Sequence, residues 1–140
     1  MPDFLAHRFF RELRSLRLPA DDFVICGSGP LFARGWIDDP GDLDIVARGA
    51  AWEIVAELGM IEAAPYSAAR RVGLFGGDLD FFDDWFPEIG TVDDLLEDAE
   101  VMGGLRFVTL DVVAMTKKMM GRGRDRVHLE VLRLHGHGVR

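Results

Sequence analysis

The sequence predicts an α/β domain built on a mixed sheet of four or five strands flanked by helices. Short apolar runs that end in turn residues, which are typical of buried strands, alternate with longer segments whose apolar residues recur every three or four positions. The connections between these segments are of ordinary length. No repeat, low-complexity stretch or linker interrupts the chain, so we expect residues 1–140 to form a single domain.

The composition is that of an ordinary globular protein. Of 140 residues, 49% are hydrophobic and 29% charged, and the formal net charge is −8. Leu, Val, Ile and Phe are frequent enough to exclude a disordered chain. The single cysteine, Cys26, excludes a disulfide scaffold and a zinc cluster of cysteines. Charged residues near the N-terminus argue against a signal peptide, and no apolar run reaches the ~20 residues needed to span a bilayer, so we expect a cytoplasmic protein without a membrane partner.

The first half of the chain alternates helical and extended patterns. Leu5, Phe9, Leu13 and Leu16 are spaced by four, four and three residues, which predicts one helical face. The run Phe23–Cys26 is apolar throughout and ends at glycine, as buried strands do. The predicted elements are a helix at 3–17, strands at 23–26 and 43–47, a short helix beginning at 31–33, and a helix at 50–58.

The second half is predicted to complete the sheet and to end in two helices. Gly76-Gly77 is a hairpin signal between two of the strands. Val127, Val131 and Leu134 share a face of the last helix, and we expect helices 110–134 to pack on the domain through such apolar faces. The predicted elements are strands at 68–75, 79–82 and 106–108, helices at 92–97, 110–120 and 124–134, and a loop at 83–90.

Charge is distributed unevenly along the chain. Residues 1–20 carry a net charge of +2, residues 21–100 carry −15, and residues 101–140 carry +5. A run of acids is usually a solvated face, but an acidic middle between basic ends also suits a protein that binds cations and an anionic ligand. The overall acidity argues against broad, non-specific binding to duplex nucleic acid, which needs many phosphate contacts from Lys and Arg.

Three carboxylates stand where a metal site would need them. Asp42 and Asp44 flank Leu43 on a predicted strand, and residues two apart on a strand point to the same face. Asp80 lies among the apolar residues of a later strand, where an acid is otherwise out of place. Because Mg²⁺ prefers carboxylate and phosphate oxygens, the three acids predict a platform for a divalent ion.

A glycine-serine turn precedes the acidic pair. Gly27-Ser28 follows a predicted strand, where backbone N–H groups can contact phosphate, and 13 residues separate Ser28 from Asp42. This order resembles the nucleotidyltransferase superfold related to DNA polymerase β, whose motif is Gly-[Gly/Ser], a gap of about a dozen residues, Asp-x-[Asp/Glu] on a strand, and a third acid on a later strand. More narrowly, the sequence resembles the small single-domain nucleotidyltransferases. This group includes minimal nucleotidyltransferase antitoxins, the AbiEii type of type IV toxin–antitoxin systems, and resistance adenylyltransferases.

The C-terminal region extends the resemblance. Lys117 on a predicted helix, followed by Gly121-Arg122-Gly123-Arg124-Asp125, is similar to the helix with a lysine and the Gly-Arg-x-x-Asp ending of the narrower group. The resemblance covers most of residues 23–134. Pro30 departs from the usual pattern after the Gly-Ser turn because it removes one N–H donor, although it suits the first turn of a helix.

The resemblance implies the chemistry of the site. Asp42 and Asp44 would hold one or two Mg²⁺ (or Mn²⁺) ions against a nucleoside triphosphate. Asp80 would share the second ion and accept the proton of the acceptor hydroxyl. The implied reaction is nucleotidyl transfer, of AMP from ATP or from another nucleoside triphosphate, to a hydroxyl of a protein, an RNA or a small molecule.

The remaining site residues are implied as phosphate contacts. Gly27 and Ser28 would hold the β- and γ-phosphates, and Lys117 would reach the leaving pyrophosphate, with Arg122 or Arg124 as alternatives. A chain of this length leaves little room for a domain that binds the acceptor. We therefore expect a partner protein such as a toxin, or a second copy of the chain (a homodimer), to complete the acceptor site. The alternatives are a catalytically inactive interaction module of the same fold, antitoxin-like, that acts by binding a protein, and nucleic-acid binding through the basic C-terminal end.

Several other residues are compatible with either a role in the site or a structural role. Trp85-Phe86-Pro87 can form a wall for a base or acceptor, or can pack on the core. Arg70-Arg71 can contact phosphate, although exposed arginine pairs are common on strands. His128 is expected at the surface or an interface. Met115, Met119 and Met120 have helical spacing and are expected in the core.

Overall fold

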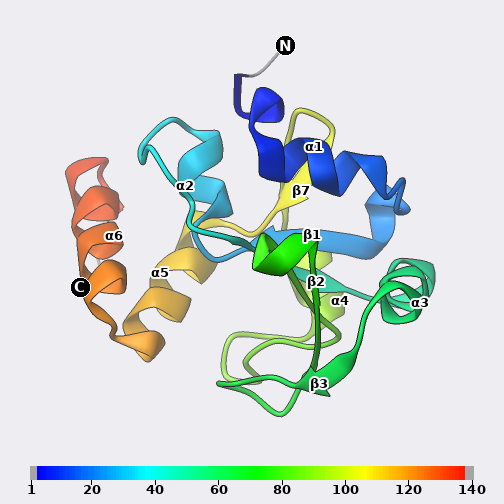
Figure 1. Ribbon diagram of the computed structural model, residues 1–140. Helices are drawn as coiled ribbons and strands as arrows, with labels where there is room; N and C mark the ends of the chain where they lie inside the picture. Colours follow the sequence, from blue (N-terminus) through cyan, green and yellow to red (C-terminus); the bar gives the residue numbers. More distant parts are fainter. Residues whose placement is uncertain (1–2, 138–140) are drawn as a thin grey trace.

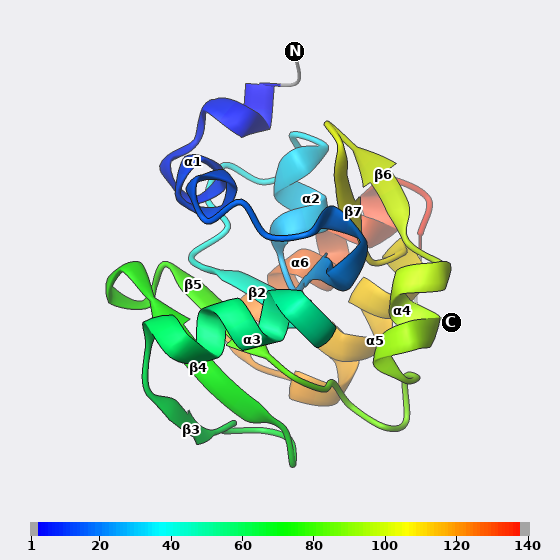
Figure 2. The same cartoon turned by 90° about the vertical axis from the view of Figure 1, so that its right-hand side faces the viewer.

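A seven-stranded mixed sheet lies at the centre of the computed structural model, which describes residues 3–137, and helices cover both of its faces (Figures 1 and 2). The strand order is β3-β4-β5-β2-β1-β7-β6. The strands are β1 (Phe23–Cys26), β2 (Leu43–Ala47), β3 (Ile61–Ala63), β4 (Arg70–Leu74), β5 (Leu79–Phe82), β6 (Glu100–Met102) and β7 (Leu105–Phe107). The helices are α1 (Arg8–Ser15), α2 (Gly29–Ala33), α3 (Gly49–Leu58), α4 (Val92–Glu97), α5 (Leu110–Met120) and α6 (Gly123–Leu134), with short 3₁₀ turns at Asp3–Ala6, Ala20–Asp22 and Phe75–Gly77.

The α/β class agrees with the sequence prediction, but the sheet has more strands than the four or five expected. The two strands that were missed, β3 and β6, lie at the two edges of the sheet and have three residues each. All three residues of β3 are exposed, so the strand has no buried face and no alternation of apolar and polar residues. β3 and β6 are strands because they pair with β4 and β7, and a pattern of burial along the sequence does not reveal them.

The centre of the sheet is a pair of parallel strands. β2 and β5 run parallel with Leu43 opposite Leu79 and Asp44 opposite Asp80. On either side of this pair, β1 is antiparallel to β2 and β4 is antiparallel to β5, through the hairpin predicted at Gly76-Gly77. The register places the two acids side by side in neighbouring strands.

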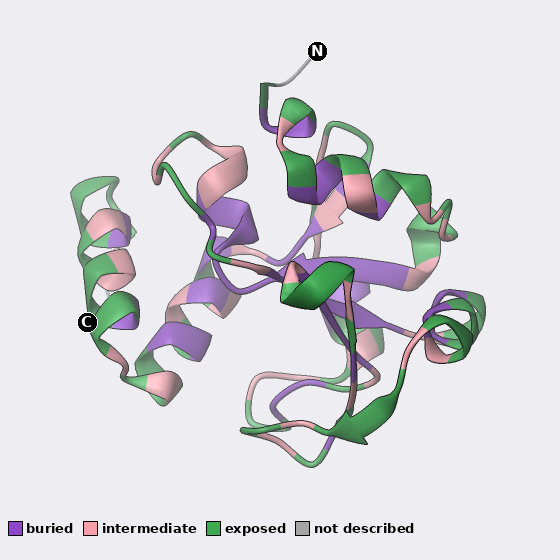
Figure 3. Ribbon diagram, viewed as in Figure 1, coloured by how far each residue is buried: buried purple, intermediate pink, exposed green. Residues whose placement is uncertain are grey.

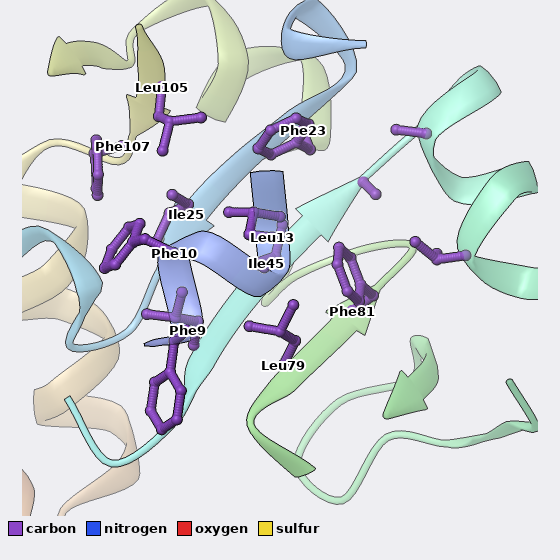
Figure 4. Packing of buried hydrophobic residues seen from close by; sticks show 14 of the residues in the cluster. Phe9, Phe10, Leu13, Phe23, Ile25, Ile45, Leu79, Phe81, Leu105 and Phe107 are labelled. Atoms are coloured by element: carbon purple, nitrogen blue, oxygen red, sulfur yellow. The ribbon is translucent and has the colours of Figure 1, made fainter. Parts of the chain in front are cut away.

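Alternating residues of the central strands face two separate cores. Ile25, Ile45 and Phe81 belong to the core under α1 and α3, which Figure 4 shows from close by. Val46 and Phe82 belong to the core under α4, α5 and α6. Asp44 and Asp80 lie between residues of the first core along their strands, so their side chains point to the face that carries α5 and α6.

The predicted helix over 3–17 is divided at His7. His7 has an extended backbone conformation, and its side chain accepts a hydrogen bond from the backbone N–H of Phe9, which caps α1. The Asp3–Ala6 turn precedes this cap. The residues that predicted the helical face remain in contact with the core: Leu5, Phe9 and Leu13 are buried, and Leu16 packs against them.

Helices α5 and α6 have the predicted bounds within one residue, but their buried faces differ from those expected. Val127 and Leu134 are 62% and 68% exposed, whereas Leu132 is fully buried. Along α6, exposed and intermediate segments predominate and buried ones are short (Figure 3). Met115 and Met119 are also exposed rather than in the core. Asp125 and Leu132, which are two turns apart on α6, face the interior. The spacing of apolar residues did not predict this face of the helix, because the face includes a buried acid. Among residues 3–137, no helix has the length and apolar character of a membrane span.

Candidate active site

Three carboxylates meet at the ends of β2 and β5. Asp44 and Asp80 are opposite each other in the parallel pair, and Asp42 lies two residues before Asp44, next to the start of β2. One oxygen from each of the three residues lies within 4.8 Å of the others. Mg²⁺ binds oxygens at about 2.0–2.1 Å, so its ligand oxygens lie no more than about 4.2 Å apart, and the three carboxylates fit one such ion, or the similar Mn²⁺, after small side-chain movements.

Gly27 makes room for this cluster. It has a φ of +61°, and a Cβ atom at this position would lie 2.8 Å from Oδ2 of Asp44. A side chain here would therefore strain the backbone and displace the carboxylate. The glycine of the Gly-Ser turn thus shapes the acidic site directly, because β1 pairs with β2 and places Cys26 opposite Asp44.

The acids are crowded and shielded from water, which changes their ionisation. Burial, followed by the charges of Asp42 and Asp80, raises the pKa of Asp44 to about 7, although Lys117 and Arg124 oppose this. Burial and Asp80 also raise the pKa of Asp42. Like charges held this close repel one another unless a proton or a cation lies between them. The cluster therefore favours binding of a positive ion.

Lys117 is a buried cation beside the acids. Its Nζ donates a hydrogen bond of 2.7 Å to Oγ of Ser28 and lies 3.4 Å from Oδ1 of Asp125. Burial lowers the pKa of Lys117 to about 8, and the charge of Arg124 acts in the same direction, whereas Asp125 raises it. The lysine is therefore held in place by one hydroxyl and one carboxylate.

Asp125 organises the start of α6. Its carboxylate accepts hydrogen bonds from the backbone N–H and the guanidinium of Arg122, with Nε at 2.7 Å. Burial opposes its ionisation, but these hydrogen bonds and the charge of Lys117 bring the pKa of Asp125 below its usual value. The Gly-Arg-x-x-Asp segment therefore acts as a cap that ties α6 to Lys117 on α5.

The Ser28 hydroxyl contacts polar side chains of both α5 and α6. Besides Lys117, its Oγ lies 3.3 Å from Nη2 of Arg124 and 3.2 Å from Nδ1 of His128. Burial, then the charges of Lys117 and Arg124, lower the pKa of His128 to about 4, so the ring is neutral near pH 7. His128 is half-buried, with its ring nitrogen against the Ser28 hydroxyl rather than free in solvent. His128 follows Arg124 by four residues, and this helical spacing was the signal that it shares the face of the arginine.

A cavity of about 190 Å³ lies between these groups. Its wall combines an acidic part, a basic part and an apolar part. The lining residues include the acids Asp42, Asp44 and Asp80, the cations Arg71, Lys117, Arg122 and Arg124, and the apolar or aromatic Tyr66, Phe82, Trp85, Phe86 and Met120. Gly27 also lines the cavity. Ser28 is buried and does not line it, and the Ser28 hydroxyl contacts Lys117 and Arg124 instead.

Trp85 and Phe86 of the aromatic loop are buried in the core under α5, and they also line the cavity. A role as a wall for a base or an acceptor stays a prediction. Trp85 Nε1 lies 3.4 Å from Oγ1 of Thr116, which directs the indole toward α5. Tyr66, which the sequence did not single out, lines the same cavity, and Cζ of Arg122 lies 5.6 Å from the centre of its ring.

The two neighbouring arginines of β4 are separated. Arg70 bonds Asp83 at 2.6 Å, lies over the ring of Trp52 and does not line the cavity. Arg71 lines the cavity and bonds the carboxylate of Asp80. Alternation along the strand accounts for the difference.

The structure thus brings seven of the eight predicted site residues to one cavity, with Ser28 directly behind its basic part. Comparisons of the chain with protein-family models, curated proteins and solved structures found no match. Function therefore has to be inferred from the chemistry of this cavity.

Proposed function

We propose that this protein catalyses metal-dependent nucleotidyl transfer, moving AMP from ATP, or the corresponding nucleotide from another nucleoside triphosphate, to a hydroxyl group. The observation that carries this proposal is the convergence of Asp42, Asp44 and Asp80 in a cavity that also has a basic and an aromatic wall. A nucleoside triphosphate has a flat apolar base, a polyanionic chain and a requirement for a divalent ion. Each of these three parts has a matching part of the wall.

The acids would bind the ion and handle the proton. Asp42 and Asp44 approach from the same segment and would hold a divalent cation between their oxygens. A bound Mg²⁺ or Mn²⁺ would neutralise charge on the reacting phosphate and orient it. Asp80, on the neighbouring strand, would accept the proton of the acceptor hydroxyl as the new phosphate ester forms.

The cations would bind the phosphate chain. Arg124 is on the exposed side of the cluster and would contact the terminal phosphates. Lys117 is held by Ser28 and Asp125 at the base of the cavity, close enough to Asp44 to affect its ionisation. We expect it to stabilise the pyrophosphate as it leaves. The aromatic wall would then receive the base.

The test is transfer of label from [α-³²P]-labelled nucleoside triphosphates. The full chain is incubated with each of the four triphosphates, Mg²⁺, and protein, RNA or small-molecule acceptors. We expect labelled acceptor with the wild type and loss of at least ~100-fold with Asp44→Asn. Asp111→Asn, an exposed acid on α5, is the matched control and should retain full activity. Equal transfer by wild type and Asp44→Asn would refute the proposal.

A binding module of the same fold makes the opposite prediction. It would need neither Asp42 nor Asp44 for its biological effect, and it would bind a protein partner tightly without nucleotide. No contact within residues 3–137 favours this second function, whereas the metal-ligand geometry favours catalysis. The Asp44→Asn variant separates the two.

A further inference from the structure

Arg71 already occupies part of the candidate metal site. Its Nη2 and Nε donate hydrogen bonds of 2.6 Å and 3.1 Å to the same oxygen, Oδ1 of Asp80. An oxygen that accepts two such bonds has its lone pairs directed at the guanidinium. In this arrangement, Asp80 has one oxygen left, Oδ2, for a cation or for the proton of an acceptor.

A second partner for Arg71 lies on the solvent side. Nη1 of the same guanidinium lies 3.2 Å from Oε2 of Glu62, which is on the edge strand β3 and half exposed. The arginine therefore bridges a carboxylate in the cavity and one at the surface. The contact with Glu62 uses Nη1, a nitrogen that does not bond Asp80.

Gly73 leaves the space in which this bridge forms. It lies opposite Asp80 in the β4–β5 pair. A Cβ atom at this position would lie 3.3 Å from Nη2 of Arg71 and 3.4 Å from Oδ1 of Asp80, tighter than most real contacts. A side chain on this strand position would thus crowd the guanidinium away from the acid.

We propose that Arg71 is a built-in competitor for the metal, which neutralises Asp80 in the metal-free protein and moves toward Glu62 when a divalent ion binds to Asp42, Asp44 and Asp80. This inference rests on the metal site of the proposed function and adds its regulation. A guanidinium and a divalent ion repel each other across a shared carboxylate, so either cation weakens the binding of the other. Arg71 would thereby set the concentration of free metal at which the site fills.

The test is a titration of the full chain with Mn²⁺ alone, followed by electron paramagnetic resonance of the free ion. Removing the competing charge with Arg71→Gln should tighten Mn²⁺ binding by about tenfold, because a positive charge no longer opposes the ion at Asp80. Glu62→Gln removes the outer partner and should weaken binding a few-fold, because Arg71 then stays on Asp80. Arg70→Gln, the neighbouring arginine outside the cavity, should leave the affinity unchanged.

The outcomes separate this inference from the proposed function. If wild type binds Mn²⁺, Asp44→Asn does not, and Arg71→Gln binds no more tightly than wild type, Arg71 is no competitor although the metal site stands. If neither wild type nor Arg71→Gln binds Mn²⁺, both proposals fail. Tighter binding by Arg71→Gln without any nucleotide transfer would support the role of Arg71 and refute the transferase. Thermal unfolding of each variant confirms that it is folded.

Discussion

Asp44 has to lose a proton before it can bind a cation, because burial beside Asp42 and Asp80 raises its pKa to about 7. With this pKa, about nine-tenths of Asp44 is ionised at pH 8 and about one-tenth at pH 6, so the apparent affinity for Mg²⁺ should be about tenfold weaker at pH 6. Isothermal titration calorimetry at pH 6, 7 and 8 and constant ionic strength measures this change. Repeating the titration in buffers with different ionisation enthalpies counts the protons released. An affinity that changes less than twofold over this range would refute the reasoning.

The same pKa determines how the stability of the metal-free protein depends on pH. The folded-state pKa of Asp44 lies above its ordinary value of 3.8, so its contribution to stability is complete below that value and is lost as the pH rises to about 7. Between pH 5 and pH 8, a shift of this size corresponds to about 2–3 kcal/mol, or about 8 °C in Tm.

Asp44→Asn is the variant that isolates this effect, because its amide carries no charge at any pH. The difference in Tm between wild type and Asp44→Asn should therefore grow from pH 5 to pH 8, with the variant more stable at pH 8. His128 acts in the opposite direction, since its pKa is lowered to about 4 and its contribution is lost as the pH falls below its ordinary value of 6.5. That contribution cancels when the two proteins are compared at the same pH. A constant difference in Tm would contradict the raised pKa.

Three further variants test the packing and the charge contacts of the site. Asp125→Ala leaves Lys117 buried without its ion partner and should cost about 3 kcal/mol in urea unfolding, whereas Asp111→Ala, an exposed acid, should cost less than about 0.5 kcal/mol. Leu132→Ala, in the core under α6, should cost about 2–5 kcal/mol in the same assay, and a cost near that of Val127→Ala would show that α6 is turned differently. Gly27→Ala should weaken Mg²⁺ binding by about tenfold in calorimetry; Gly76→Ala has a similar φ but no neighbouring atoms, so it should leave the affinity unchanged.

The strands that are buried on both faces could be predicted from the sequence. Phe23–Cys26 is an apolar run, Leu79–Phe82 is apolar apart from Asp80, and both are strands of the structure. The convergence of Asp42, Asp44 and Asp80 could also be predicted, because an acid inside an apolar strand has to have a partner or a ligand. Whether they bind a metal stays a prediction.

What could not be predicted depends on contacts between distant segments. Gly76-Gly77 predicts the β4–β5 hairpin but not the turn type and loop length that fix its register, and this register brings Arg71 to Asp80. The burial of Asp125 beside Lys117 could not be predicted either, and it accompanies an orientation of α6 in which Val127 is exposed and Leu132 is buried.

The three-residue strands at the two ends of the sheet have a consequence for self-association. At about 3.3 Å per residue, each edge is about 10 Å long, which offers a second molecule only one or two pairs of free backbone groups. Each edge also carries a glutamate, Glu62 or Glu100, that is paired with an arginine of its own chain. The shortness of both edges and their paired glutamates thus disfavour growth of the sheet by strand addition.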